Sequence, residues 1–428
     1  MISKYITQIR NSLSQFSAGE KMFIVAAMFC SYLISAEYAI VRPVSNSLFI
    51  ASYGAKAFPW AWILSIPLNL FIVTLYNRYL GRLGCFSLFF IIASIVTGIN
   101  ALSSVLLSMH SVVPFLYYIW KDIYVMLMFQ LLWSVIHTST HLSRAKYLYG
   151  LLFGVGAVGG LTGSVIAGSF AVSVGSENLL LFTIPIYTLL IFAYKMLIKF
   201  SASTEQKVAS DIKNNAPFKE SISLILGSRL LFSILLMVAF MQITATLTDF
   251  QFNNYLEKLY PEKDVRTQYF GRLLAFGNIL TMTFQFIGVY ALIKLMGKYK
   301  THLMIPIVLG FNCFSFILFP VFGVISYAFL TIKCFDFSLF NVIKEMLYIP
   351  LKTEEKFRAK ALIDVFMYRG SKIFASFVVM IAQLFFANSV VGALSWVNLL
   401  LFITWCFVVY SIKKCYDDPE PVKEPAQS

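Results

Sequence analysis

Residues 84–107 read GCFSLFFIIASIVTGINALSSVLL and contain no charged side chain. As one α-helix, a run of this length crosses the roughly 30 Å hydrocarbon core of a bilayer. The whole chain is 59% hydrophobic and only 13% charged, whereas a soluble domain of this size keeps a charged surface. The stretch therefore predicts a protein whose surroundings are lipid.

Similar apolar runs recur along the chain in two groups of six, separated by a polar stretch that begins at Ser201. We expect transmembrane helices near residues 22–41, 58–76, 84–107, 112–136, 148–173 and 178–198, then 230–252, 269–292, 302–321, 324–342, 362–387 and 393–412. The fold class predicted is an all-α membrane protein of about twelve spans. We divide it into an N-terminal six-helix half (1–200), a cytoplasmic linker (201–229), and a C-terminal six-helix half with a short cytoplasmic tail (230–428).

Basic residues give this chain its net charge of +14, and they cluster between the apolar runs. They fall on one side, in both tails, in the linker and in the loops near 78–82, 144–146, 294–300 and 352–360. By the positive-inside rule that side is cytoplasmic. We expect a multi-pass protein of a bacterial inner membrane with both termini in the cytoplasm. Lipid is then the surrounding partner, nucleic acid is not expected, and a monomer is compatible with the pattern.

Metal, cofactor and enzyme chemistry have no signature in the sequence. The six cysteines are scattered singly without a CxxC pair. His137 and His141 have no third ligand nearby. No nucleophile, general base and orienting group occur at triad-like spacing, so we expect no catalytic residue, no metal and no cofactor.

Short internal similarities suggest two related halves. Residues 77–82 (NRYLGR) resemble residues 293–298 (IKLMGK), and the Arg-Ala-Lys of 144–146 recurs at 358–360, with Gly156 and Gly370 following at the same offset. Parallel six-helix repeats of this kind are typical of major-facilitator transporters, whose substrate site lies at midplane between the halves. The sequence thus predicts a 6+6 pseudo-symmetric carrier.

Ionisable side chains at membrane depth are costly and mark sites or charge pairs. In the first half these are Glu37, Arg42, Lys121 and Asp122. Glu37 is expected to be a gate or pairing residue, and Arg42 either a site residue or an interfacial arginine. Adjacent helix residues cannot face each other, so Lys121 and Asp122 each call for a cavity or a partner on another helix.

Aromatic residues surround the Lys121–Asp122 pair. Their π faces are suited to stacking a base, so we include them in the predicted substrate site: Tyr117, Tyr118 and Tyr124.

The second half has corresponding charges. Asp249, expected at the end of its helix, is either a cavity acid or an interfacial carboxylate. Lys333 and Asp336 share a helix face, and Lys344 and Glu345 follow near its end; these four are expected to form gate or structural charge pairs.

Arg369 and Lys372 lie three apart on one face of the eleventh predicted helix. Two cations at that depth need anions, which a phosphate or carboxylate substrate would supply. Pairing with Asp364 or Asp336 is the alternative.

Glycines recur at residues 150, 154, 156, 159, 160, 163 and 168. No strand precedes them and no Lys-Ser/Thr follows, so a phosphate loop is not indicated. Their small-xxx-small spacing predicts close packing of this helix against another.

The segment from Ser338 to Lys372 resembles the nucleotide transporter (ATP/ADP translocase) family of intracellular bacteria and plastids. The resemblance lies in Ser-Leu-Phe at 338–340, KEMLYIPL at 344–351, KALIDV at 360–365, and Arg369 followed by Lys372. It implies a nucleotide carrier in which charged residues near a central cavity bind the substrate. Lys372 falls where the family has a functional Lys, and Asp249 where it has a Glu.

The first and fourth predicted helices depart from the family pattern. After Arg42 the family has Lys-Asp, and this chain has Ser45 and Asn46; the family Glu of the fourth helix falls on Lys121 or Asp122. We therefore expect a divergent carrier of nucleotides, or of nucleotide-like anions such as a dinucleotide, working by exchange or by proton-coupled uptake. The alternatives are a carrier of a non-nucleotide metabolite and a membrane protein that has lost transport.

Overall fold

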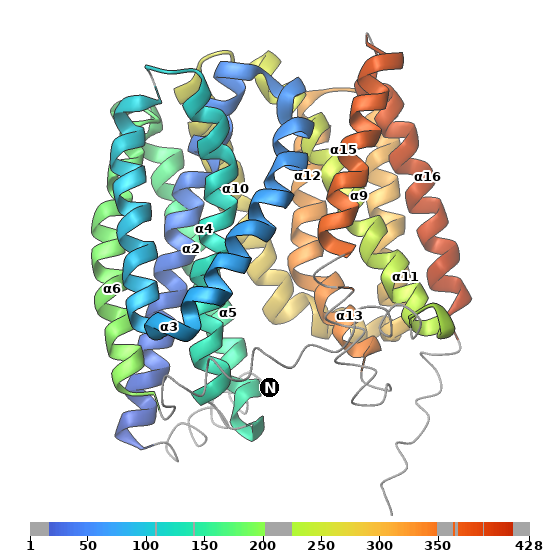
Figure 1. The fold of residues 1–428 in the computed structure, drawn as a ribbon. Coiled ribbons are helices and arrows are strands. Elements are labelled where there is room, and N and C mark those ends of the chain that lie inside the picture. The colour runs from blue at the N-terminus through green and yellow to red at the C-terminus, as the bar shows by residue number, and fades with distance from the viewer. Residues whose placement is uncertain are drawn as a thin grey trace, which may run out of the picture. The chain divides into compact units, whose positions relative to one another are not determined.

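The computed structural model describes residues 17–107, 109–139, 142–201, 225–348, 363, 367–387 and 389–413. The regular structure of these residues is helical throughout (Figure 1). The first half contains α2 (Ala18–Tyr53), η1 (Ala55–Ala57), α3 (Phe58–Leu106), α4 (Val112–Ser139), α5 (Leu142–Val174), η2 (Asn178–Phe182) and α6 (Thr183–Lys199). The second contains α9 (Arg229–Leu259), α10 (Lys263–Thr283), η3 (Phe284–Gly288), α11 (Val289–Leu318), α12 (Phe322–Phe335), η4 (Asp336–Phe340), α13 (Asn341–Leu347), α15 (Tyr368–Phe385) and α16 (Val390–Ser411).

Nine helical stretches in the described residues are long and apolar enough to cross a membrane. Two of them, of 52 and 56 residues, are about twice as long as a bilayer requires. Each bends at a glycine with positive φ, at Gly84 and Gly297. If each of these two stretches counts as two spans, the nine stretches give eleven spans. α15 is the twelfth, and its Arg369 and Lys372 lower its mean hydropathy. The total agrees with the twelve spans predicted.

Several helix ends differ from the sequence prediction. α2 continues to Tyr53 instead of ending near residue 41, and α9 continues to Leu259 instead of residue 252. The polar residues Ser45 and Asn46 are buried in the last turns of α2, where backbone hydrogen bonds are satisfied within the helix. Asp249, placed at a helix end by the prediction, therefore lies within α9, and Arg42 lies within α2.

The chain forms two compact units. One comprises residues 1–54, 64–214 and 260–278, and the other comprises 55–63, 215–259 and 279–428. Each unit is built mainly from one sequence half, while 55–63 and 260–278 pack with the other half's unit. The linker expected at 201–229 lies largely outside the described residues, so the predicted domain boundaries stay a prediction.

Glycines of α5 bring it against the backbone of α2. A Cβ on Gly159 would lie 2.2 Å from the carbonyl oxygen of Tyr32, and one on Gly163 would lie 2.0 Å from that of Ala36. Only glycine permits this approach, in which close van der Waals contact holds two helices together. The packing role predicted for the glycine series is confirmed.

Gly84 and Gly297 mark equivalent turns in the two halves. Their φ/ψ values are 77°/167° and 79°/163°, and their separation of 213 positions is close to the 214 that relates Gly156 to Gly370. Our alignment of residues 77–82 with 293–298 placed Gly81 opposite Gly297 instead, which is wrong: Gly81 is not among the positive-φ glycines of the described chain.

We expect Gly84→Ala to lower the free energy of unfolding by about 1–3 kcal/mol, because its φ/ψ region is nearly exclusive to glycine. Thermal denaturation of the purified protein measures the effect. Gly81→Ala is the matched control, since its added methyl group meets no atom within 4 Å. Equal melting temperatures for the two variants would contradict the assigned strain.

Candidate functional site

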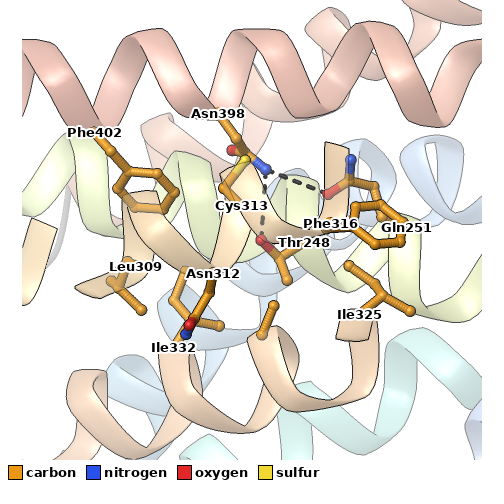
Figure 2. A pocket seen from close by; sticks show the side chains of 11 residues that line it. Thr248, Gln251, Leu309, Asn312, Cys313, Phe316, Ile325, Ile332, Asn398 and Phe402 are labelled. Atoms are coloured by element: carbon orange, nitrogen blue, oxygen red, sulfur yellow. Dashed lines mark hydrogen bonds between the residues drawn. The ribbon is translucent and has the colours of Figure 1, made fainter. Parts of the chain in front are cut away.

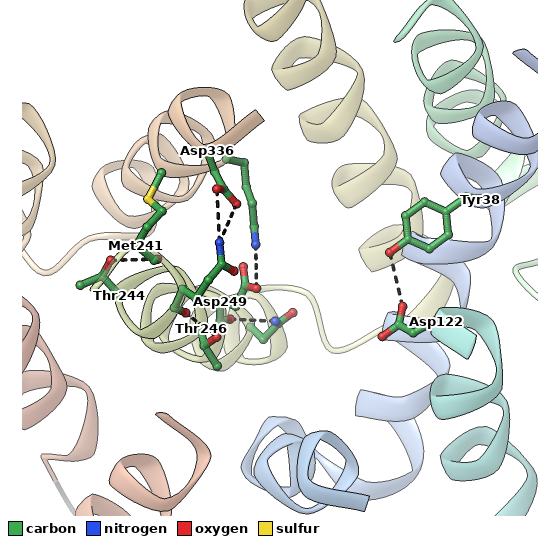
Figure 3. A network of polar contacts seen from close by, with 10 residues as sticks. Tyr38, Asp122, Met241, Thr244, Thr246, Asp249 and Asp336 are labelled. Atoms are coloured by element: carbon green, nitrogen blue, oxygen red, sulfur yellow. Dashed lines mark hydrogen bonds and ion pairs between the residues drawn. The ribbon is translucent and has the colours of Figure 1, made fainter. Parts of the chain in front are cut away.

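A charged cluster lies between α2 and α4. Lys121 Nζ is 2.8 Å from Asp122 Oδ1. Figure 3 shows the Tyr38 hydroxyl, which donates to the same oxygen at 3.4 Å. The expectation that these adjacent residues could not meet is wrong, because the long lysine side chain bends back to its neighbour. Lys121 is only 3% exposed, so its ammonium requires this carboxylate.

Tyr118 completes this cluster. The Lys121 ammonium lies 4.0 Å from the centre of the Tyr118 ring, within cation–π range. The Phe49 ring packs against the Tyr118 ring, with the two ring centres 4.8 Å apart. A buried cation is thus held between one carboxylate and one aromatic face.

The second unit contains a similar cluster. Lys333 Nζ of α12 is 2.9 Å from Asp249 Oδ2 of α9, and Gln242 Nε2 donates to both oxygens of Asp336 at 3.3 and 3.4 Å (Figure 3). Asp336 opens the π-helical turn η4, a geometry frequent at functional sites. Lys333 therefore pairs across helices, while Asp336 is held by an uncharged amide.

The two clusters occupy related places in the repeat. Asp122 of α4 and Asp336 at the end of α12 are separated by 214 positions, the offset that also relates Gly156 to Gly370. The first and fourth spans of a unit are joined by the Tyr38–Asp122 contact in one unit and by the Lys333–Asp249 pair in the other. An anion that attracts either lysine must compete with the aspartate bound to it.

Glu37 lies in the interior of the first unit. Its Oε1 accepts from the Tyr124 hydroxyl at 2.7 Å and from Asn100 Nδ2 at 3.4 Å. Asn100 in turn contacts Thr183 Oγ1 at 3.0 Å and the Tyr117 hydroxyl at 2.9 Å. This network joins α2, α3, α4 and α6.

Two of the predicted base-stacking residues belong to this network. Tyr117 is 3% exposed and Tyr124 is not exposed, and the hydroxyls of both are occupied by the contacts just described. Both side chains are enclosed in this conformation, and their role in stacking a base stays a prediction. Tyr118 is the one of the three whose ring contacts the lysine cluster.

The remaining predicted cations lie on two helices, α2 and α15. The Arg42 guanidinium is 6.0 Å from the Phe270 ring centre, and Lys372 Nζ is 5.7 Å from that of Trp62. Arg369 is half-buried one turn before Lys372 on α15. Asp364, its alternative partner, lies outside the described residues.

Lys344 and Glu345 lie on the short helix α13. Their gate role stays a prediction.

A small polar cavity lies inside the second unit, between α9, α11, α12 and α16 (Figure 2). Its volume is about 10 Å³, room for about one water molecule. Asn398 Nδ2 approaches Thr248 Oγ1 at 3.5 Å and Gln251 Oε1 at 3.4 Å. Asn312 Nδ2 and Asn398 Oδ1 have no hydrogen-bond partner and supply one donor and one acceptor here.

Sequence reasoning missed the uncharged members of these networks. It singled out ionisable residues, whereas Asn100, Gln242, Gln251 and Asn398 are amides within apolar runs. An amide within an apolar run could have been recognised as a candidate, because a buried amide needs hydrogen-bond partners just as a buried charge does. Among the described residues no group of three or more His, Cys, Asp or Glu side chains is placed to hold a metal ion.

Comparison with known proteins identifies the family. A sequence profile of the TLC ATP/ADP transporter family matches residues 104–416, most of the chain. The chain belongs to this family. It is similar to ADP,ATP carrier protein 3 of Rickettsia prowazekii, with 23% identity covering 92% of this chain and 94% of that one. ADP,ATP carrier protein 1 of Rickettsia typhi is 22% identical, with 96% and 97% covered.

Solved structures show the fold of this family member. A D-xylose–proton symporter superimposes with a TM-score of 0.63 at 14% identity, covering 92% of this chain and 98% of that one. An inward-facing bacterial homologue of the iron transporter ferroportin gives a TM-score of 0.64 at 11% identity, covering 91% and 100%. These likenesses confirm the predicted major-facilitator-like, all-α fold.

Proposed function

We propose that this transporter carries nucleotides, or closely related anions, across a bacterial inner membrane by alternating access. The observation that carries the proposal is the lysine–aspartate pair in each unit, Lys121 with Asp122 and Lys333 with Asp249. Membership of an ATP/ADP transporter family supports a phosphate-bearing substrate. The transport mode is exchange or proton-coupled uptake, and no covalent chemistry is involved.

The pair in each unit explains how the carrier is stable both empty and loaded. Without substrate, each aspartate neutralises its lysine, which avoids an isolated charge at membrane depth. A substrate phosphate offers more oxygens and more negative charge than a carboxylate, so it displaces the aspartate from the ammonium. A released Asp122 keeps the Tyr38 hydroxyl as a hydrogen-bond partner.

The other predicted residues would extend this site. Arg42, Arg369 and Lys372 supply further positive charge, and Tyr118 offers an aromatic face beside Lys121. Bidentate arginine contacts are suited to phosphate oxygens. Asp336, held by Gln242, would limit the positive charge on the α12 side of the site.

The orientation proposed follows from the basic loops. Both termini face the cytoplasm, the chain is surrounded by lipid, and one copy suffices for the 6+6 architecture.

Uptake of labelled ATP, ADP and NAD into bacterial cells that express the protein tests the proposal. We expect at least one of these probes to enter faster than in cells carrying the empty vector, and to be competed by the others. Exclusion of all three, together with uptake of a metabolite that has no nucleotide, would replace nucleotide by that class of substrate.

We expect Lys372→Ala to reduce uptake of the transported probe about tenfold, because one hydrogen bond to a charged group is worth about 1.5–3 kcal/mol. Initial uptake rates, normalised to the amount of protein in the membrane, measure the effect. Lys298→Ala, which removes an exposed lysine of the same unit, is the control and should leave the rate unchanged. Identical rates for both variants would remove Lys372 from the site.

A further inference from the structure

The Glu37 carboxyl group is enclosed, with no counterion among the described residues. Glu37 is 1% exposed, its Oε1 accepts from Tyr124 and Asn100, and its Oε2 has no hydrogen-bond partner within the described part of the chain. In the part of the chain that the structure describes, no lysine or arginine ion pair with Glu37 is recorded. An ionised carboxylate in this place would carry an uncompensated charge.

The helices around Glu37 offer hydroxyl groups and amides only. α4 contributes Tyr117 and Tyr124, α6 contributes Tyr187, and α3 contributes Asn100. The surface of α5 against α2 is made of small residues, and residues 152–174 contain no ionisable side chain. On α2 itself the nearest charged residue is Arg42, five positions along.

This environment favours the neutral carboxylic acid. Burying an isolated carboxylate costs many kcal/mol, so such a group binds a proton instead. The tyrosine and amide contacts are available to the protonated acid as well as to the anion. A neutral Glu37 therefore suits this environment better than an ionised one.

The C-terminal repeat shows what packing alone requires at this position. Gln251 follows Glu37 by 214 positions and occupies an equivalent buried network on α9 (Figure 2). Its Nε2 donates to the Val391 carbonyl at 2.9 Å and to Ser395 Oγ at 2.8 Å. Asn312 of α11 likewise follows Asn100 of α3 by 212 positions. An uncharged amide fills the site in one half, so the carboxyl group in the other half has a use beyond packing.

We propose that Glu37 binds and releases one proton in each transport cycle, and that this carrier thereby moves its anionic substrate together with a proton. The inference rests on the proposed function and selects between its two transport modes.

The location of Glu37 couples its proton to the substrate site. The next residue, Tyr38, donates to Asp122, which holds Lys121. A deprotonated Glu37 would add negative charge one residue from this cluster and weaken anion binding. By linkage, protonation and anion binding strengthen each other by the same factor, so the two travel in the same direction.

Purified protein reconstituted in liposomes, with the membrane potential clamped at zero, tests the coupling. For one proton per substrate, the steady-state accumulation of labelled ATP should rise about tenfold for each pH unit by which the outside is made more acidic, since 1.4 kcal/mol is a factor of ten. We expect Glu37→Gln to abolish this rise and to retain ATP/ADP counterflow, in which no net proton movement is needed. Glu37→Asp keeps a carboxyl group and should keep the pH response.

Two results would overturn the inference: a tenfold response that persists in Glu37→Gln, or wild-type counterflow with no response to the pH jump. Wild-type protein that shows no counterflow with ATP, ADP or NAD would contradict the proposed substrate instead. In that case the infrared C=O band of a protonated carboxyl group tests whether Glu37 carries a proton. A band at neutral pH that disappears in Glu37→Gln supports the proton site, and identical spectra reject it.

Discussion

We expect Gly163→Ala to abolish transport and to lower the free energy of unfolding by at least about 3 kcal/mol, the upper range for overpacking in a rigid core. The added methyl group would lie 2.0 Å from the Ala36 carbonyl oxygen and 2.9 Å from the Ala39 Cβ. Both belong to α2, so the clash is with backbone as well as a side chain, and no rotamer change relieves it. α5 must move away from α2, and this movement also disturbs Glu37 and Tyr38.

The melting temperature of the detergent-solubilised protein and its uptake rate measure this effect. Gly98→Ala is the matched control, because Gly98 also lies within a transmembrane helix and its added methyl group meets no atom within 4 Å. The control should retain transport and melt at or slightly above the wild-type temperature, since alanine is the better helix former. A Gly163→Ala protein as stable as Gly98→Ala would contradict the close α2–α5 contact.

We expect Lys333→Ala to reduce transport about 10- to 100-fold, more than Lys372→Ala does, because it removes a charged hydrogen-bond donor and also leaves a carboxylate unpaired. Lys333 Nζ lies 2.9 Å from Asp249 Oδ2. Asp249 Oδ1 has no hydrogen-bond partner among the described residues, so the substitution leaves a carboxylate unpaired inside the bundle. Uptake rate and melting temperature should therefore fall together.

A double substitution separates the two effects. Lys333→Ala with Asp249→Asn removes both charges, so we expect the melting temperature to recover while transport stays low. Lys258→Ala, at the exposed end of α9, serves as the lysine control. Recovery of transport in the double variant would show that the pair is structural and that Lys333 does not bind substrate.

The spans themselves were predictable from the sequence. Lipid leaves an apolar run of about 20 residues no stable alternative to a helix, so each run corresponds to a helix in the structure. The ends were less predictable: α2 and α9 continue through polar residues that other helices bury. Gly84 was misaligned with its repeat partner because one-letter similarity does not show which glycine has positive φ.

The ionisable site residues were also predictable, since a charge within an apolar run is rare and costly. Their partners were not. Lys121 bends back to its neighbour Asp122, Lys333 reaches α9 rather than Asp336, and Tyr117 and Tyr124 turn into the bundle toward Asn100 and Glu37. Helix spacing gives the direction in which a side chain leaves the backbone, but a long or rotatable side chain finds its partner in three dimensions.

The sequence alone determined the membrane class, the twelve spans, the two repeats and the family, because each depends on local composition or on matched residues along the chain. The tertiary structure alone decided which charges neutralise each other, which tyrosines are buried, and that Glu37 has no counterion in the described chain. These properties depend on contacts between helices that are distant in sequence. Residues 84–107 required a helix in lipid, and only packing showed that Asn100 within that helix would contact Glu37.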